Sequence, residues 1–211
     1  GAGAIGLHYA RQLARRGAKR IVLLSRRPVD PTELAALAAP TGAEVLSVSC
    51  DLTDPDAVAA AAGRYGGAGA SLLIHAAGAA TFDTGDRIDP QATANTLAAK
   101  LIGLSRLVRD WPLRPDARLL LCSSVSGRWG GQGHTVYAAA NRMLDVAAHR
   151  LRAEGRDAVA IRWGLWQSGP ETGRGIVDAD EAARIRRSGL LPMAPAEAVE
   201  ASLLAHTHDP L

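Results

Sequence analysis

Long apolar runs and cysteine-rich motifs are both missing from this sequence of 211 residues. No run reaches the ~18 apolar residues that a membrane-spanning helix needs, so we expect no membrane partner. Residues 1–3 also lack the basic and then apolar pattern of a signal peptide. The two cysteines, Cys50 and Cys122, belong to no CxxC or His/Cys ligand pattern. We therefore expect a cytoplasmic protein with reduced cysteines and no metal site.

Charge of one sign is not concentrated anywhere along the chain either. The 24 basic and 21 acidic residues are interspersed and give a formal net charge of +3. This pattern argues against a nucleic-acid partner, which would favour a basic patch. Hydrophobic residues make up 47% of the sequence and charged residues 21%. Such a composition is typical of one soluble domain with a sizeable core.

Short apolar runs alternate with helix-like stretches, the pattern of βα units that close a parallel sheet. We expect a doubly wound, Rossmann-like α/β fold with three αβα layers, whose ligand crevice lies at the carboxyl ends of the strands. The expected strands are residues 20–25, 44–50, 71–75, 118–122 and 158–163, which are β-branched or leucine-rich. The expected helices are residues 5–16, 32–39, 55–64, 90–109 and 136–154.

The two ends of the pattern depart from a complete fold of this type. The chain opens on a glycine loop, although such a loop follows the first and most central strand. We therefore expect that strand to be missing, so that residues 1–211 form an N-terminally incomplete catalytic domain. After the fifth strand, helical patterns resume at residues 179–187 and 194–205. We expect the region from about 167 to 192 to form a substrate lid over the crevice.

The glycine loop of residues 1–6 fits the pattern G-x-G-x-x-G. Small residues there let the backbone approach a pyrophosphate that rests on the N-terminus of the following helix. The residues expected to bind the dinucleotide are Gly1, Gly3, Ala4, Ile5 and Gly6. Taken alone the pattern is weak, because such glycine spacing arises by chance in a chain with 22 glycines.

Ser25, Arg26 and Arg27 end the next expected strand, about 20 residues after the glycine loop. An acidic residue there would bind the ribose 2′-hydroxyl, whereas arginines pair with a 2′-phosphate. We therefore expect NADPH as the cofactor. The alternative is a solvated arginine pair at a strand end.

Two further strand ends belong to the same predicted cofactor site. Asp51 and Leu52 follow the strand expected over residues 44–50, where they would meet the adenine ring. Ala76, Ala77 and Gly78 follow the strand expected over residues 71–75, where small side chains would let the cofactor lie against the backbone. The alternatives are a helix cap or turn at Asp51 and a plain turn at the glycine.

The most informative segment is residues 119–141, LLLCSSVSGRWGGQGHTVYAAAN. Hydride addition to a ketone creates an alkoxide, so the site needs an acid and a hydrogen-bond donor for the oxygen. Tyr137 is the candidate acid, Lys100 the cation expected to lower its pKa, and Ser124 the donor. Asn141 shares a helix face with the tyrosine and would organise a proton relay. Singly, each of the four also fits an ordinary packing or capping role.

This segment resembles the active site of the short-chain dehydrogenase/reductase superfamily, and in particular of the ketoreductase domains of modular polyketide synthases. Most of the superfamily has lysine four residues after the tyrosine; here Asn141 takes that place and Lys100 takes the usual place of the asparagine. The elements SRR, CDLTD, HAAG and RWGLW extend the resemblance over nearly the whole chain. It implies that Lys100 and Tyr137 also contact the cofactor, and that Gly164 and Leu165 lie near the nicotinamide.

The resemblance further implies NADPH-dependent reduction of a β-ketoacyl thioester on an acyl carrier protein, beside an upstream structural subdomain and other synthase domains. Residues 80–82 read Ala-Thr-Phe where one stereochemical class carries Leu-Asp-Asp. Trp129, eight residues before the tyrosine, is similar to the A-type class, and His134, three residues before it, to the subgroup with an epimerised α-substituent. The implied product is an L-β-hydroxyacyl thioester. The alternatives are loop packing for both residues, a silent or epimerising scaffold domain, and a free-standing dehydrogenase.

Overall fold

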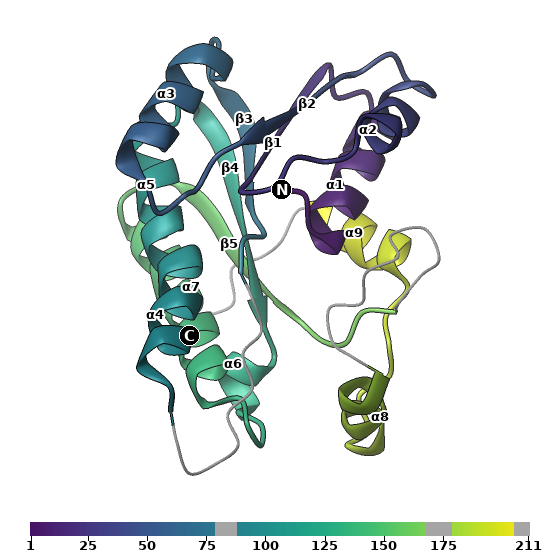
Figure 1. Ribbon diagram of the computed structural model, residues 1–211, viewed down its shortest axis with the longest axis vertical. Coiled ribbons are helices and arrows are strands. Elements are labelled where there is room, and N and C mark those ends of the chain that lie inside the picture. The colour runs from purple at the N-terminus through teal and green to yellow at the C-terminus, as the bar shows by residue number, and fades with distance from the viewer. Residues whose placement is uncertain (79–87, 168–178, 205–211) are drawn as a thin grey trace. The chain divides into compact units, whose positions relative to one another are not determined.

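The computed structural model describes residues 1–78, 88–167 and 179–204, the first four of the last range through their backbone alone (Figure 1). Helices and strands alternate along most of the chain. In chain order they are α1 (Ala4–Arg15), β1 (Arg20–Ser25), α2 (Pro31–Ala38), β2 (Glu44–Ser49), α3 (Pro55–Tyr65), β3 (Ala70–His75), α4 (Pro90–Leu97), the π-helical turn η1 (Ala98–Ile102), α5 (Gly103–Asp110), β4 (Leu113–Ser124), α6 (Ser126–Trp129), α7 (Thr135–Ala153), β5 (Asp157–Trp163), α8 (Ala179–Arg187) and α9 (Pro195–Leu203).

The strands form two parallel sheets, β1-β2 and β3-β4-β5. A doubly wound sheet of order 3-2-1-4-5-6 has the strand before the glycine loop at its centre. Strands β1 and β2 correspond to strands 2 and 3 of that scheme, and β3, β4 and β5 correspond to strands 4, 5 and 6. The parallel α/β, Rossmann-like class predicted from the sequence is therefore confirmed. The described chain divides into two compact units, residues 1–51 with 164–204 and residues 52–163.

The first unit packs α1 and α2 against β1 and β2. Its buried core combines apolar side chains from the glycine loop, both helices, β1 and the loop after β1: Ala2, Leu7, Ala10, Leu23, Val29 and Leu37. Helix α9 packs on α1, where the hydroxyls of Tyr9 and Ser202 share a buried hydrogen bond of 2.7 Å. Helix α1 is thereby held from both the sheet and the C-terminal helix.

The second unit places α3, α4, α5 and α7 on one face of the β3-β4-β5 sheet (Figure 1). Strand β4 is central, and its residues Leu119, Leu120 and Leu121 are fully buried. Helix α7 contacts both β4 and β5. The carboxyl end of β4 and the first turns of α7 therefore belong to one packed body.

Local sequence explains where the helices begin and end. Three helices start with Asp-Pro: Asp30, Asp54 and Asp89 each accept a backbone N–H two residues on, at 2.8–2.9 Å, while the proline takes the first helical position. Helix α7 ends at Ala153, and Gly155, two residues on, has a φ of 82° that permits the left-handed turn closing the helix.

The predicted elements recur with small shifts in their ends, and three differences are larger. The helix expected over residues 90–109 contains the π-turn η1, and the fourth strand begins at Leu113, five residues before the predicted start. The short helix α6 was not predicted. Of the predicted lid, α8 lies in the described chain, whereas residues 168–178 lie outside it. The lid, and the strand expected before Gly1, stay predictions.

Candidate active site

The four residues predicted to carry the reaction all lie in the second unit. Ser124 is the last residue of β4, Tyr137 lies in the first turn of α7, Asn141 lies one turn further on, and Lys100 lies in η1. Helix α6 can approach α7 closely because of Gly127, where a Cβ would come within 2.9 Å of the Arg142 nitrogen. This close crossing fixes the turn between Ser124 and Tyr137.

The Lys100 side chain is buried against Tyr137. Only 5% of Lys100 is exposed, and its Nζ lies 5.6 Å from the centre of the Tyr137 ring. A Cβ on Gly78 would come within 2.9 Å of the lysine Cε and 3.0 Å of its Nζ. The glycine that the sequence analysis assigned to the cofactor therefore also makes room for this lysine.

Burial governs the protonation of both groups. It lowers the pKa of Lys100 to about 8, because the ammonium is removed from water. Burial also raises the pKa of Tyr137, although hydrogen bonding by Ser124 and Asn141 acts in the opposite direction. The expected net lowering of the Tyr137 pKa by Lys100 is thus wrong for this structure: the loss of hydration outweighs the stabilising neighbours.

His75 supports the backbone at Lys100, a role that the sequence analysis missed. Its Nε2 lies 2.9 Å from the Lys100 carbonyl oxygen, and the side chain is buried. Burial lowers the pKa of His75 to about 4, so the ring is neutral at physiological pH and its Nε2–H donates to the carbonyl. His75 is the last residue of β3, so this contact joins the end of that strand to η1. The π-turn it supports is a form of helix often found at functional sites.

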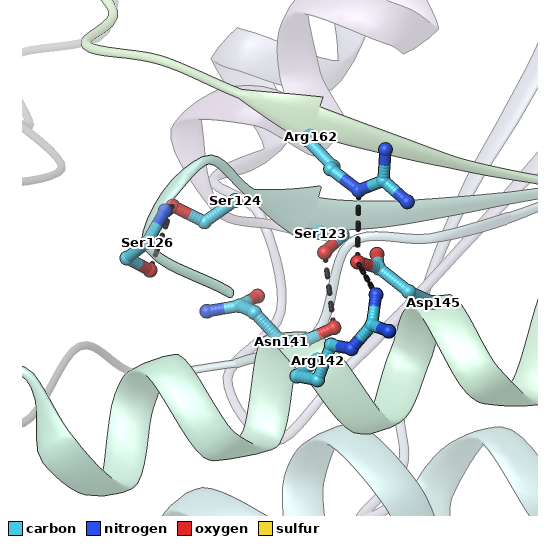
Figure 2. Close-up of polar contacts among 7 residues, drawn as sticks. All are labelled: Ser123, Ser124, Ser126, Asn141, Arg142, Asp145 and Arg162. Atoms are coloured by element: carbon cyan, nitrogen blue, oxygen red, sulfur yellow. Dashed lines mark hydrogen bonds and ion pairs between the residues drawn. The ribbon is translucent and has the colours of Figure 1, made fainter. Parts of the chain in front are cut away.

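Hydrogen bonds hold both the side chain and the backbone of Asn141. Its Nδ2 donates to the Tyr137 carbonyl, one turn earlier in α7, at 2.8 Å. Its backbone carbonyl accepts from the hydroxyl of Ser123, in β4, at 3.0 Å (Figure 2). The side-chain Oδ1 is buried and has no hydrogen-bond partner within the described chain. This atom is an acceptor that a water molecule or a substrate group can use.

Asp145 anchors α7 to β5 and was also missed. It is one turn beyond Asn141, its side chain is fully buried, and its Oδ2 accepts from Arg162 Nε at 2.8 Å (Figure 2). Arg142 Nη1 lies 3.7 Å from the same oxygen. Tyr137, Asn141 and Asp145 follow one another at intervals of four residues, so one face of α7 carries the acid, its neighbour and the anchor.

The glycine loop of the first unit fits a bound dinucleotide. A Cβ on Gly6 would lie 2.1 Å from the Gly1 carbonyl oxygen, and one on Gly1 would lie 2.8 Å from the Leu24 nitrogen. A Cβ on Gly3 would meet nothing within 4 Å. Gly3 is the N-cap of α1 and has no side chain to cap it. The loop is therefore tightly packed on one side and open at the helix N-terminus, where a pyrophosphate is stabilised.

Arg26 and Arg27 are exposed after β1, also in the first unit. Two serines hold the backbone at these arginines. The Ser25 hydroxyl donates to the Arg27 carbonyl, and the Ser49 hydroxyl donates to the Arg26 carbonyl at 3.3 Å. Both guanidinium groups are accessible to an anionic group. The remaining predicted cofactor residues divide between the units: Ala4, Ile5, Asp51, Gly164 and Leu165 lie in the first, and Leu52, Ala76 and Ala77 in the second.

Two of these residues have structural partners of their own. The Leu165 carbonyl accepts from the Met193 nitrogen at 2.7 Å, and Leu52 is buried where a Cβ on Gly103 would approach it to 3.0 Å. Packing is therefore at least part of the role of Leu52.

The predicted steering residues flank the turn before Tyr137. Trp129 ends α6 and is 70% exposed, whereas His134 is the N-cap of α7. The rings of His134 and Tyr137 meet edge to face, with centroids 5.9 Å apart. Residues 80–82, where the Leu-Asp-Asp motif is absent from the sequence, lie outside the described residues.

Comparison with known proteins identifies the family. The KR domain model matches residues 1–168. The pikromycin polyketide synthase component PikAIII of Streptomyces venezuelae is 39% identical over 216 residues, which cover 99% of this chain and 13% of that protein. The chain belongs to the ketoreductase domain family of modular polyketide synthases.

Solved ketoreductases have the same fold. PlmKR1, from the first module of phoslactomycin biosynthesis in Streptomyces sp. HK803, matches with a TM-score of 0.84 and 34% identity over 95% of this chain and 47% of its own. The first ketoreductase of the tylosin polyketide synthase matches with a TM-score of 0.84 and 35% identity over 95% of this chain and 44% of its own. The ketoreductase domain described here thus spans under half the length of these structures, and it is an oxidoreductase of the short-chain dehydrogenase/reductase superfamily.

The described residues lack two further kinds of feature. No helix among them is both long and apolar enough to cross a bilayer. Nor do three or more His, Cys, Asp or Glu side chains among them gather as a candidate metal site.

The buried lysine generates a prediction for stability. Lys100 titrates near pH 8 when folded and near 10.5 when unfolded, so between these values the unfolded chain binds more protons and the wild type gains stability as pH rises. Below pH 8 the charged lysine costs up to about 3 kcal/mol, so Lys100→Met should be the more stable protein there. Urea unfolding of both proteins from pH 7 to 10.5 measures the difference between their free energies of unfolding. The contributions of the titrating groups that the two proteins share cancel in this difference. A difference that does not change with pH contradicts the buried, depressed lysine.

Proposed function

We propose that this ketoreductase domain uses NADPH to reduce a β-ketoacyl thioester, carried by an acyl carrier protein, to the L-β-hydroxyacyl product during polyketide assembly. The observation that supports it best is the Lys100 ammonium buried against the Tyr137 ring, in the same unit as Ser124 and Asn141. In this role the domain works in the cytoplasm beside an upstream structural subdomain and other synthase domains.

The side chains of the second unit divide the proton chemistry among them. The cofactor, when bound, supplies hydride to the ketone carbon, and the ketone oxygen becomes an alkoxide. Ser124 donates a hydrogen bond to that oxygen, and Tyr137 gives it a proton. The phenolate left behind is stabilised by the Lys100 ammonium. A proton from solvent restores the phenol by way of a water that donates to the open Oδ1 of Asn141.

The first unit supplies the choice of nucleotide. Gly3 leaves the N-terminus of α1 open to a pyrophosphate, and exposed Arg26 and Arg27 favour a 2′-phosphate. We assign Ala4, Ile5 and Gly6 to the same phosphate-binding turn, and Asp51 with Leu52 to the adenine end. Ala76, Ala77, Gly78, Gly164 and Leu165 are assigned to backbone contacts further along the cofactor.

Tyr137→Phe tests the acid. The wild-type domain, in its natural polypeptide, should oxidise NADPH with a β-ketoacyl thioester surrogate, followed by absorbance. The phenylalanine variant removes only the proton donor, so kcat should fall about 10²- to 10⁴-fold while folding is retained, as judged by circular dichroism. A wild type that folds but leaves NADPH unoxidised would instead indicate a silent or epimerising scaffold domain.

Arg26→Ala tests the nucleotide. Loss of a charge-assisted bond to the 2′-phosphate should raise the KM for NADPH about 10-fold or more and leave the KM for NADH nearly unchanged. Steady-state kinetics with both nucleotides measure this, with exposed Arg64→Ala on α3 as the control for loss of a surface charge. An equal effect on both nucleotides would argue against recognition of the 2′-phosphate.

Chiral chromatography of the product tests the A-type assignment. The wild type should release the L-β-hydroxy product, and Trp129→Ala should lower its enantiomeric excess, because an exposed indole beside the Tyr137 turn steers how the chain enters. The variant's melting temperature should change little, since the side chain is 70% exposed. A D-configured product from the wild type would contradict the assignment.

A further inference from the structure

We propose that Ser126 is a positioning residue that directs the hydroxyl proton of Ser124 toward the Tyr137 phenol and the substrate oxygen. The inference deepens the reaction proposed above, on which it rests. It concerns a residue that the sequence analysis did not single out.

The geometry around Ser124 carries the argument (Figure 2). Its Oγ accepts two hydrogen bonds from one neighbour: the Ser126 backbone nitrogen lies at 3.2 Å and the Ser126 Oγ at 3.0 Å. Both side chains are buried, with exposed fractions of 8% and 6%. The two serines therefore form a closed pair at the junction of β4 and α6.

A serine hydroxyl has one proton to donate and two lone pairs that accept. Ser126 fills both accepting positions of Ser124, so the capacity that remains on Ser124 is donation. The catalytic step requires a donor, because negative charge develops on the ketone oxygen. Without Ser126 the Ser124 hydroxyl can rotate between accepting and donating arrangements. In part of the molecules its proton then points away from the ketone oxygen.

The electrostatics of Tyr137 count Ser124 among its hydrogen-bonding neighbours. Hydrogen bonding by Ser124 acts to lower the pKa of Tyr137, although burial outweighs it and the net pKa is raised. When substrate binds, the ketone oxygen takes the place of an acceptor that Ser124 is set to serve.

Ser126 is itself held firmly. The preceding residue, Val125, donates its N–H to the Trp163 carbonyl at 3.0 Å, and the Ser126 carbonyl accepts from the Gly130 nitrogen at 2.8 Å. The first bond joins the turn to the end of β5 and the second closes α6. Because the Ser126 backbone is fixed at both sides, its N–H and hydroxyl reach Ser124 without further ordering.

A double-mutant cycle tests the proposal, with kcat measured for reduction of the thioester surrogate. Ser126→Ala keeps the backbone N–H but loses the hydroxyl, so kcat should fall about 3- to 10-fold, the usual value of one neutral hydrogen bond. In Ser124→Ala, kcat should fall about 10²- to 10³-fold. Since Ser126 acts through Ser124, the double variant should be no slower than Ser124→Ala.

Two further measurements separate positioning from general damage. The pH dependence of kcat should show the limb due to Tyr137 moved to higher pH in Ser126→Ala, and the KM for NADPH should not change. Ser126→Thr retains the hydroxyl and should recover most of the lost rate. Exposed Ser105→Ala on α5 controls for loss of a serine and should behave as wild type.

The outcomes distinguish this inference from the proposed function. An active wild type in which Ser126→Ala keeps full kcat, or in which the two losses multiply in the double variant, would overturn the role of Ser126 alone. A folded wild type without reductase activity would overturn the proposed function. An unshifted pH profile in an impaired Ser126→Ala would assign the residue to packing.

Discussion

The burial of one ammonium group constrains the rest of the active site. Removing a cation from water costs several kcal/mol, and no ion pair within the described residues offers Lys100 a carboxylate in return. The surrounding features reduce that cost or hold the group despite it. The Tyr137 ring faces the Nζ at 5.6 Å, Gly78 leaves the space that the side chain fills, and His75 fixes the backbone carbonyl of the π-turn. A charge kept in place against such a cost is typical of a functional position.

The same unit shows how the hydroxyl proposed to act on the substrate is held by a regular fold. Strand β4 delivers Ser124, and α7 delivers Tyr137; the short helix between them is pressed on α7 through Gly127. The Asp145 and Arg162 pair joins the far side of that turn to β5. Removing Arg162 would leave the Asp145 carboxylate buried with only Arg142 nearby, and such a loss usually costs more than the pair contributes. The candidate site is thus attached to rigid elements at each end. Only the polar groups at the ends of its side chains are left to form hydrogen bonds with a bound molecule.

The fold class could be predicted from the sequence because it depends on local patterns, such as apolar runs of strand length that alternate with helical stretches. The spacing of Ser124, Tyr137 and Asn141 can also be recognised without knowing any contact, although their roles in the reaction stay predictions. Features that depend on distant partners were missed: the π-turn at Lys100, which reads as plain helix, the bond from His75 to its carbonyl, and the Asp145–Arg162 pair, whose members are 17 residues apart. The direction of the Tyr137 pKa failed for the same reason, since burial is a property of the packed chain.

That raised pKa suits a reductase better than the lowered one would. In the proposed reaction the general acid must still hold its proton when the alkoxide forms, and burial favours the protonated form of Tyr137. The alkoxide is a far stronger base than a phenolate, so transfer remains downhill from a phenol of raised pKa. The assistance required comes afterwards, when a buried phenolate must be stabilised, and Lys100 supplies it while the pH stays below about 8. Lysine and tyrosine are therefore matched by the burial they share: it keeps the proton on the acid before the reaction and strengthens the attraction between the ions that the reaction creates.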